Sequence, residues 1–207
     1  MTSYQGENRL VLQGELMADP VLSHQNHGTN YYMAPLRVPR LSGAADELNL
    51  VTTLPDPALW KAGNWLRVEG EVRSYNNRTG VGSRLVITVL ARAVREGIPG
   101  EGENKLILSG VLCKNPTRRR TPLGREICGL LLAVNRPYGR ADYLPCIAWG
   151  SLAAACGEME VGDPLRLEGR LQSRRYRKVI DGVDYERVAY EVSVMNLLEE
   201  EEGSQYV

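Results

Sequence analysis

Residues 63–74 read GNWLRVEGEVRS, and residues 162–173 read GDPLRLEGRLQS. In both stretches an apolar residue or glycine alternates with a polar one, from Leu66 to Val72 and from Leu165 to Leu171. A period of two is typical of a β-strand that buries one face. The shared pattern, Gly-x-x-Leu-Arg-x-Glu-Gly, predicts the same strand in two copies of one fold.

The repeat extends upstream of this strand. Asn8 to Leu48 align without a gap on Asn104 to Leu144, and the second copy then has three additional residues. A period of roughly a hundred residues is too long for a solenoid and indicates two whole domains. We expect OB-type domains at residues 6–97 and 103–198, followed by an acidic tail at residues 199–207.

The order of elements in the second copy predicts this fold class. We expect strands at residues 105–112, 127–134, 142–149, 164–173 and 188–194, with a short helix capped by Ser151 between the third and the fourth. This order is typical of the five-stranded Greek-key OB barrel. The first copy repeats it with a single helical turn after Asp56. The chain is therefore predicted to be all-β, with two tandem OB domains.

Composition narrows the class of protein. The chain has 207 residues and is 43% apolar, which suffices for a modest core in each of two domains. No stretch is long and apolar enough to cross a membrane, and the N-terminus lacks an apolar signal region. We expect a cytoplasmic protein.

Metal-ligating residue types do not form a recognisable site. The four cysteines lie in the second half, at Cys113, Cys128, Cys146 and Cys156. They form no Cys-x-x-Cys pair and three of them fall inside apolar strands, so we expect buried, reduced thiols. His24 and His27 stand in a polar loop without further ligands. We expect neither a metal nor a cofactor.

Two basic clusters fall in predicted loops of the second copy. The first loop contains Arg118, Arg119 and Arg120, and the second contains Arg174, Arg175, Arg177 and Lys178 around Tyr176. The chain as a whole is neutral, with 25 Lys and Arg against 25 Asp and Glu. One basic run alone is often a solvated loop, whereas two runs in one domain favour a polyanion as partner.

Several ordered motifs give the second copy a resemblance to a known family. They are NKLILSG at residues 104–110, TPLG at 121–124, LAVNR at 132–136, IAWG at 147–150, GD at 162–163 and EGRLQSR at 168–174. In this order and spacing they resemble the bacterial single-stranded DNA-binding protein family. The first copy resembles the same family more faintly.

The resemblance implies a binding mode in which bases stack on aromatic side chains and a positive groove follows the phosphates. The family's aromatic positions fall on Tyr138, Tyr143, Trp149 and Tyr176. The cations expected beside them are Arg118, Arg119, Arg120, Arg136, Arg140, Arg174, Arg175, Arg177 and Lys178. Any one of these aromatic residues alone is as consistent with packing in the core or in a loop.

The first copy lacks this aromatic set. Ser42, Glu47 and Thr53 occupy the matching places, and Tyr75 is the only aromatic residue that remains. We expect the second domain to carry most of the binding. Trp65, which alternates outward, marks either a partner surface or packing against a neighbouring loop.

The leading hypothesis is a non-enzymatic, sequence-tolerant binder of single-stranded DNA in replication, recombination or repair. Family members place four OB domains around the DNA, so the resemblance implies a homodimer, with replication or repair proteins as possible partners. The alternative is a replication or primosome accessory protein whose first domain binds protein and whose DNA binding is weak. A nuclease would need clustered carboxylates, and no such cluster lies on the predicted strands.

Overall fold

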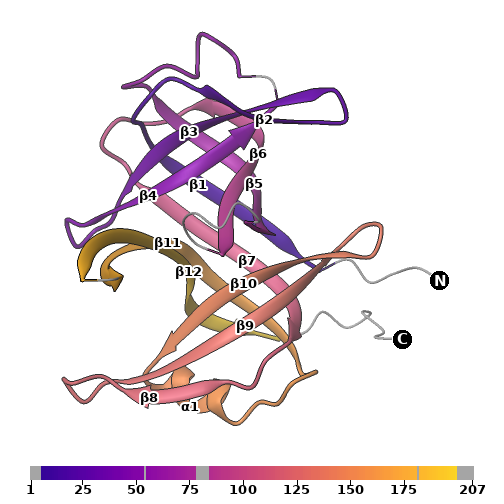
Figure 1. Cartoon of the computed structure of the whole chain (residues 1–207), viewed down its shortest axis with the longest axis vertical. Helices are drawn as coiled ribbons and strands as arrows, with labels where there is room; N and C mark the ends of the chain where they lie inside the picture. Colours follow the sequence, from indigo (N-terminus) through magenta and orange to yellow (C-terminus); the bar gives the residue numbers. More distant parts are fainter. Residues whose placement is uncertain (1–5, 54, 78–83, 181, 200–207) are drawn as a thin grey trace. The chain divides into compact units, whose positions relative to one another are not determined.

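The computed structural model describes residues 6–53, 55–77, 84–180 and 182–199 (Figure 1). In this part of the chain, strands dominate and one short helix is present. The first repeat forms β1 (Asn8–Leu16), β2 (Val21–Asn26), β3 (Thr29–Pro39), β4 (Ala45–Thr52), β5 (Trp65–Asn76) and β6 (Leu85–Glu96). The second repeat forms β7 (Glu103–Leu112), β8 (Thr117–Arg120), β9 (Glu126–Arg136), β10 (Arg140–Trp149), α1 (Ser151–Gly157), β11 (Pro164–Ile180) and β12 (Val183–Leu198).

The two repeats have the same strand topology. The first runs in the order β2-β3-β4-β6-β5-β1 and the second in the order β8-β9-β10-β12-β11-β7. A further pairing, β3 with β1 and β9 with β7, curls each sheet back on itself. Each repeat has a parallel pairing at the same place, β4 with β6 and β10 with β12. The prediction of an all-β protein with two tandem OB domains is confirmed.

A repeated glycine permits the closure of each sheet. A Cβ atom at Gly14 would clash with the carbonyl oxygen of Arg37, and one at Gly110 with that of Ala133. The neighbouring residues are the ones that pair across the closure, Glu15 with Arg37 and Val111 with Ala133. Glycine therefore occurs at the same position in the two copies because two backbones approach each other closely there.

The helix differs in detail from the prediction. Its N-cap is Gly150, with φ of 59°, and no side chain caps it, so the assignment of Ser151 as the cap was wrong. Ala153 and Cys156 are its buried residues, and it packs on β8, β9 and β10 (Figure 1). In the first repeat a turn replaces the helix, and the Ala58 amide donates to Oδ1 of Asp56 over 2.8 Å.

Both segments predicted as basic loops are largely strands. Arg118, Arg119 and Arg120 lie on β8, which pairs with β9. With β2 as its counterpart, the described part of each repeat has six strands rather than the expected five. β11 continues to Ile180 and β12 already begins at Val183. Their connection has Gly182 at φ of 78°, as a tight turn requires, and Asp181 lies outside the described residues.

The chain divides into two compact units that do not coincide with the two repeats. Of the described residues, the first-repeat unit contains those within 9–105 and 172–190, and the second-repeat unit contains 6–8, 106–171 and 191–199. The outer part of the β11–β12 hairpin, residues 172–190, is called the hairpin arm below. It comes from the second repeat in sequence and belongs to the first-repeat unit by its contacts.

The cysteines are all free, and their environments differ. Cys128 and Cys146 are buried on strands as expected, and Cys156 is buried on α1, so two cysteines rather than three lie on strands. Cys113 follows the end of β7 and is exposed, contrary to the expectation of a buried thiol. Burial raises the pKa of the Cys156 thiol to about 11, so the thiol form prevails at neutral pH. No helix of the described residues is long and apolar enough to span a membrane.

Candidate nucleic-acid interface

The outer face of β10 presents two of the predicted aromatic residues. Side chains alternate along this strand, so Leu144, Cys146 and Ala148 are buried in the barrel while Tyr143 and Trp149 point outward. Tyr143 is 46% exposed and Trp149 is 40% exposed, so neither is a core residue. They are six residues apart, which corresponds to about 20 Å along a strand.

The neighbouring strands continue this outer face. Across the β9–β10 ladder, Pro145 lies opposite Leu131 and Ile147 opposite Gly129. On the next strand, Thr117 lies opposite Gly129. The three strands therefore present a largely apolar surface between the two aromatic residues.

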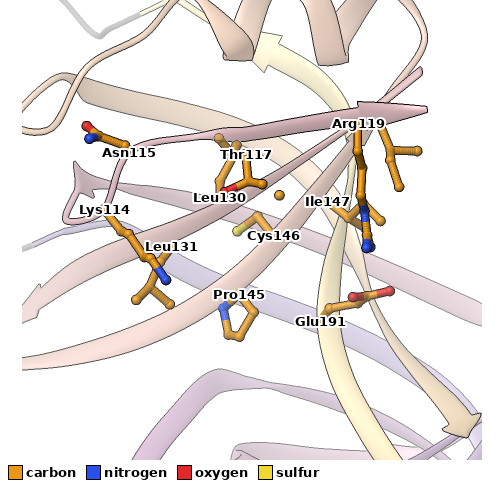
Figure 2. A pocket seen from close by; sticks show the side chains of 12 residues that line it. Lys114, Asn115, Thr117, Arg119, Leu130, Leu131, Pro145, Cys146, Ile147 and Glu191 are labelled. Carbon is orange, nitrogen blue, oxygen red and sulfur yellow. The ribbon is translucent and has the colours of Figure 1, made fainter. Parts of the chain in front are cut away.

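This surface is hollowed into a pocket of about 290 Å³, here called the β10 groove (Figure 2). The volume is close to the lower end of small-molecule sites, about 300 Å³. The lining residues are Lys114, Asn115, Thr117, Arg119, Ile127, Gly129, Leu130, Leu131, Pro145, Cys146, Ile147 and Glu191. Figure 2 shows Lys114 and Arg119 on opposite sides, with Pro145 and Cys146 between them and Glu191 on the same side as Arg119. The groove thus combines apolar walls with a cation at each side.

Gly129 keeps part of the groove open. A Cβ atom built at this position has no other atom within 4 Å, so the space above it is free. The sequence analysis missed Gly129, Leu131 and Lys114 as site residues. The alternation along residues 141–149 together with the antiparallel register would have pointed to the first two, since both face outward opposite β10.

The three consecutive arginines of β8 have different environments. Arg119 lines the groove. Arg118 lies on the other face of the strand, where its guanidinium group is 3.0 Å from Glu158 and 3.6 Å from Glu126. Arg120 pairs with Glu126 at 3.2 Å. Alternation along the strand, which a loop would not impose, separates Arg119 from its two neighbours.

Three further predicted residues lie in the connection from β9 to β10 or at the strand ends beside it. Tyr138 is 96% exposed and has a φ of 64°, so its ring projects from a tight turn into solvent. Arg140 is exposed at the start of β10. Arg136 lies 3.3 Å from the fully buried carboxylate of Asp142. The first repeat has the same pair, Arg40 with Asp46, which indicates a structural role for Arg136.

The remaining predicted residues lie on the hairpin arm, in the first-repeat unit. Arg174 is placed over the ring of Tyr176, with 5.6 Å from its guanidinium carbon to the ring centroid, a cation–π geometry. Arg177 and Lys178 are exposed. Arg175 is 2.9 Å from Glu47 and 3.4 Å from Glu186. The structure therefore separates the predicted site into a β10 group and an arm group, each in its own unit.

Comparison with known proteins identifies the second repeat. Residues 103–198 match the model of the Single-strand binding protein family. This repeat belongs to that family. The match covers the strands of the β10 groove and the whole β11–β12 hairpin.

Proteins named single-stranded DNA-binding proteins are similar to this chain as well, and one of them matches well beyond a single repeat. A single-stranded DNA-binding protein of Deinococcus radiodurans is 28% identical over 205 residues, covering 80% of this chain and 67% of the relative. One of Bacillus cereus is 35% identical over 92 residues, covering 41% of this chain and 52% of the relative. The chain thus spans about half to two thirds of the length of these relatives.

A solved structure shows the same fold over the whole chain. The single-stranded DNA binding protein of Thermus aquaticus superposes with a TM-score of 0.77 and 23% identity, and covers 99% of this chain and 98% of its own. The two-repeat architecture is therefore that of a known single-strand binding protein.

The first repeat departs from the single-strand binding pattern on β4, the counterpart of β10. Glu47 stands where β10 has Tyr143, and Ser42 and Thr53 stand where the second repeat has Tyr138 and Trp149. Tyr75 is not the counterpart of Tyr176, and its assignment as the remaining aromatic residue of the set was wrong. Ser74 aligns with Ser173, so Tyr75 aligns with Arg174. Tyr75 is 55% exposed on β5.

Proposed function

We propose that this chain binds single-stranded DNA through the β10 groove, with Tyr143 and Trp149 as stacking residues at its two ends. One observation carries the proposal: two exposed aromatic side chains share an outer sheet face with an apolar groove that also holds Lys114 and Arg119. The relatives named single-stranded DNA-binding proteins support DNA as the polymer.

The chemistry of the groove suits the faces of bases. Aromatic rings and apolar side chains contact a base through its π-face, and each stacked base contributes about 1–3 kcal/mol. Such contacts do not depend on the hydrogen-bonding edge, so binding tolerates sequence. Lys114 and Arg119 supply positive charge for the phosphates that accompany these bases.

The other predicted residues are proposed as secondary contacts. Tyr138 and Tyr176 would stack on further bases, and Arg140, Arg174, Arg177 and Lys178 would contact phosphates. Arg118, Arg120 and Arg136 already lie beside carboxylates and would contribute less. We propose no catalytic step, because Glu191 is the one carboxylate among the groove residues.

A fluorescence titration tests the proposal. Trp149 is exposed, whereas Trp60 is buried and Trp65 half-buried, so stacking should quench mainly Trp149. Oligo-dT and oligo-rU are titrated at two salt concentrations, with Trp149→Phe as the control that removes the reporter. We expect saturable quenching by oligo-dT that weakens with salt. No saturable response to oligo-dT would contradict the proposal and favour the accessory-protein alternative.

Filling the groove provides a second test. Gly129→Leu adds a side chain to the open space and meets no atom of the protein at its Cβ. We expect normal folding and a loss of about 1–3 kcal/mol in binding, the value of one stacked base. Binding as tight as that of the wild type would mean that bases do not enter the groove.

We also propose a homodimer, because two chains would bring together the four OB domains expected from the family. Light scattering at micromolar concentration measures the mass directly. Roles in replication, recombination or repair, with proteins of those processes as partners, are proposed on the same resemblance.

A further inference from the structure

The hairpin arm contacts β4, the strand of the first repeat that corresponds to β10. The contacts lie within the first-repeat unit and run along β4. The Arg175 guanidinium is 2.9 Å from the carboxylate of Glu47. The Ser173 hydroxyl accepts a hydrogen bond from the Glu47 amide over 2.9 Å, and the Ser173 amide donates to Oδ1 of Asp46, also over 2.9 Å.

The other strand of the arm adds a contact further along β4. The Asn49 amide group donates to the Tyr190 hydroxyl over 3.3 Å. Burial, and then the negative charge of Glu47, raise the pKa of Tyr190, which keeps this hydroxyl protonated. Both strands of the arm are therefore held by a short stretch of β4, from Asp46 to Asn49.

The residue types on β4 favour contact with the arm over contact with a nucleic-acid base. Glu47 stands at the position that corresponds to Tyr143 in the second repeat, so this strand offers a negative charge instead of an aromatic ring. A carboxylate repels phosphate and attracts guanidinium. Hydrogen bonding to Glu47 and its charge accordingly raise the pKa of Arg175.

We propose that Glu47 docks the hairpin arm on β4 and competes with the phosphates of single-stranded DNA for Arg175. This inference rests on the proposed function. Arg175 is 60% exposed and Glu47 is 49% exposed, so their ion pair is weak and phosphate can replace the carboxylate. Arg177, two positions further along β11, lies on the same side of the strand as Arg175 because side chains alternate, and it gives a DNA strand a further contact. Glu47 thereby lowers the affinity of the whole chain for DNA.

A double-mutant cycle on the full chain tests the competition. Affinity for oligo-dT is measured for the wild type, Glu47→Gln, Arg175→Ala and the double variant. Removing the competitor should tighten binding about 1.5- to 5-fold, the range of exposed ion pairs, and steepen the salt slope by up to about 0.7. Arg175→Ala should weaken binding, and adding Glu47→Gln to it should change nothing further.

Glu69→Gln is the matched control. Glu69 is a similarly exposed glutamate of the same repeat, and it pairs with Arg95 at 3.4 Å rather than with the arm. The Glu69→Gln variant should bind oligo-dT with an affinity near that of the wild type. An equal gain from Glu69→Gln would show that any lost negative charge helps, and would overturn the proposal.

Hydrogen exchange without DNA tests the docking independently. The Ser173 amide should exchange faster in Glu47→Gln than in the wild type, and faster still in Glu47→Arg. The swapped pair Glu47→Arg with Arg175→Glu should restore slow exchange. Unchanged exchange in both Glu47→Gln and Glu47→Arg would overturn the docking.

The two experiments separate the possible failures. If the wild type does not bind oligo-dT, the proposed function is wrong, and exchange still decides whether Glu47 docks the arm. If the wild type binds and Glu47→Gln binds equally or more weakly, the competition is wrong although the function stands.

Discussion

At the scale of one residue, truncation of Trp149 tests whether this side chain belongs to a binding surface or to the core. Its side chain is 40% exposed on the outer face of β10, so truncation should remove a DNA contact rather than a core contact. We expect Trp149→Ala to melt near the wild type and to lose about 1–3 kcal/mol of binding to oligo-dT. Thermal melting by circular dichroism and a titration by anisotropy measure the two effects.

Trp60 gives the opposite case in the same chain. It is 4% exposed, and truncating a buried tryptophan costs about 3–5 kcal/mol of stability. Trp60→Ala should lower the melting temperature strongly. A comparable drop for Trp149→Ala, with normal binding of the folded fraction, would place Trp149 in the core and leave stacking to the tyrosines.

Gly110 lies at the place where β7 and β9 pair to close the sheet of the second repeat. A methyl group there would clash with the carbonyl oxygen of Ala133 at the β7–β9 closure, whereas one at Gly129 on β9 would meet nothing. We expect Gly110→Ala to destabilise the protein by about 1–3 kcal/mol and Gly129→Ala to leave stability unchanged or slightly increased. Chemical denaturation measures both, and equal stabilities would show that the closure can yield.

β8 allows a test at the scale of one element, because its arginines face opposite ways. Arg119→Ala removes a cation of the groove and should flatten the salt slope by up to about 0.7, one phosphate contact. Arg118→Ala removes a partner of Glu158 and Glu126 and should leave the slope unchanged. Affinities for oligo-dT at four salt concentrations give both slopes. A larger effect from Arg118 would show that DNA follows the other face.

The elements that the sequence predicted well are those with apolar alternation. Buried and mostly apolar residues at alternate positions made β7, β9, β10 and the first half of β11 recognisable, and the repeat then indicated the barrel. β8 and the hairpin arm were missed because their residues are mostly charged or exposed. β8 is stabilised by its pairing with β9, and the two strands of the hairpin arm pair with each other. A local sequence pattern does not reveal such pairing.

The candidate site was predictable to a similar extent. Tyr143 and Trp149 could be placed on one face because they differ by an even number of positions on one strand. The ionic partners of Arg118, Arg136 and Arg175 were not predictable, because Glu158, Asp142 and Glu47 become neighbours only through folding. The sequence therefore indicated which cations exist, but not which of them carboxylates already engage.

At the scale of the whole molecule, the cations of the hairpin arm predict how DNA binding depends on salt concentration. Replacing Arg174, Arg175 and Arg177 by alanine should weaken binding and flatten the salt slope. Three full phosphate contacts would change the slope by about 2. We expect less than this, because Arg175 already lies beside Glu47 and Glu186. Weaker binding with an unchanged slope would mean that the arm does not contact phosphate.

Glu47 also breaks a symmetry. In an assembly of identical one-domain subunits, every substitution recurs in each copy, so a glutamate at the stacking position would remove the ring from all faces at once. Two copies joined in one chain mutate separately. Tyr143 is kept in one copy while Glu47 stands at its counterpart in the other. The duplicated chain can therefore assign different tasks to two folds of the same shape, which a symmetric ring of single domains cannot do.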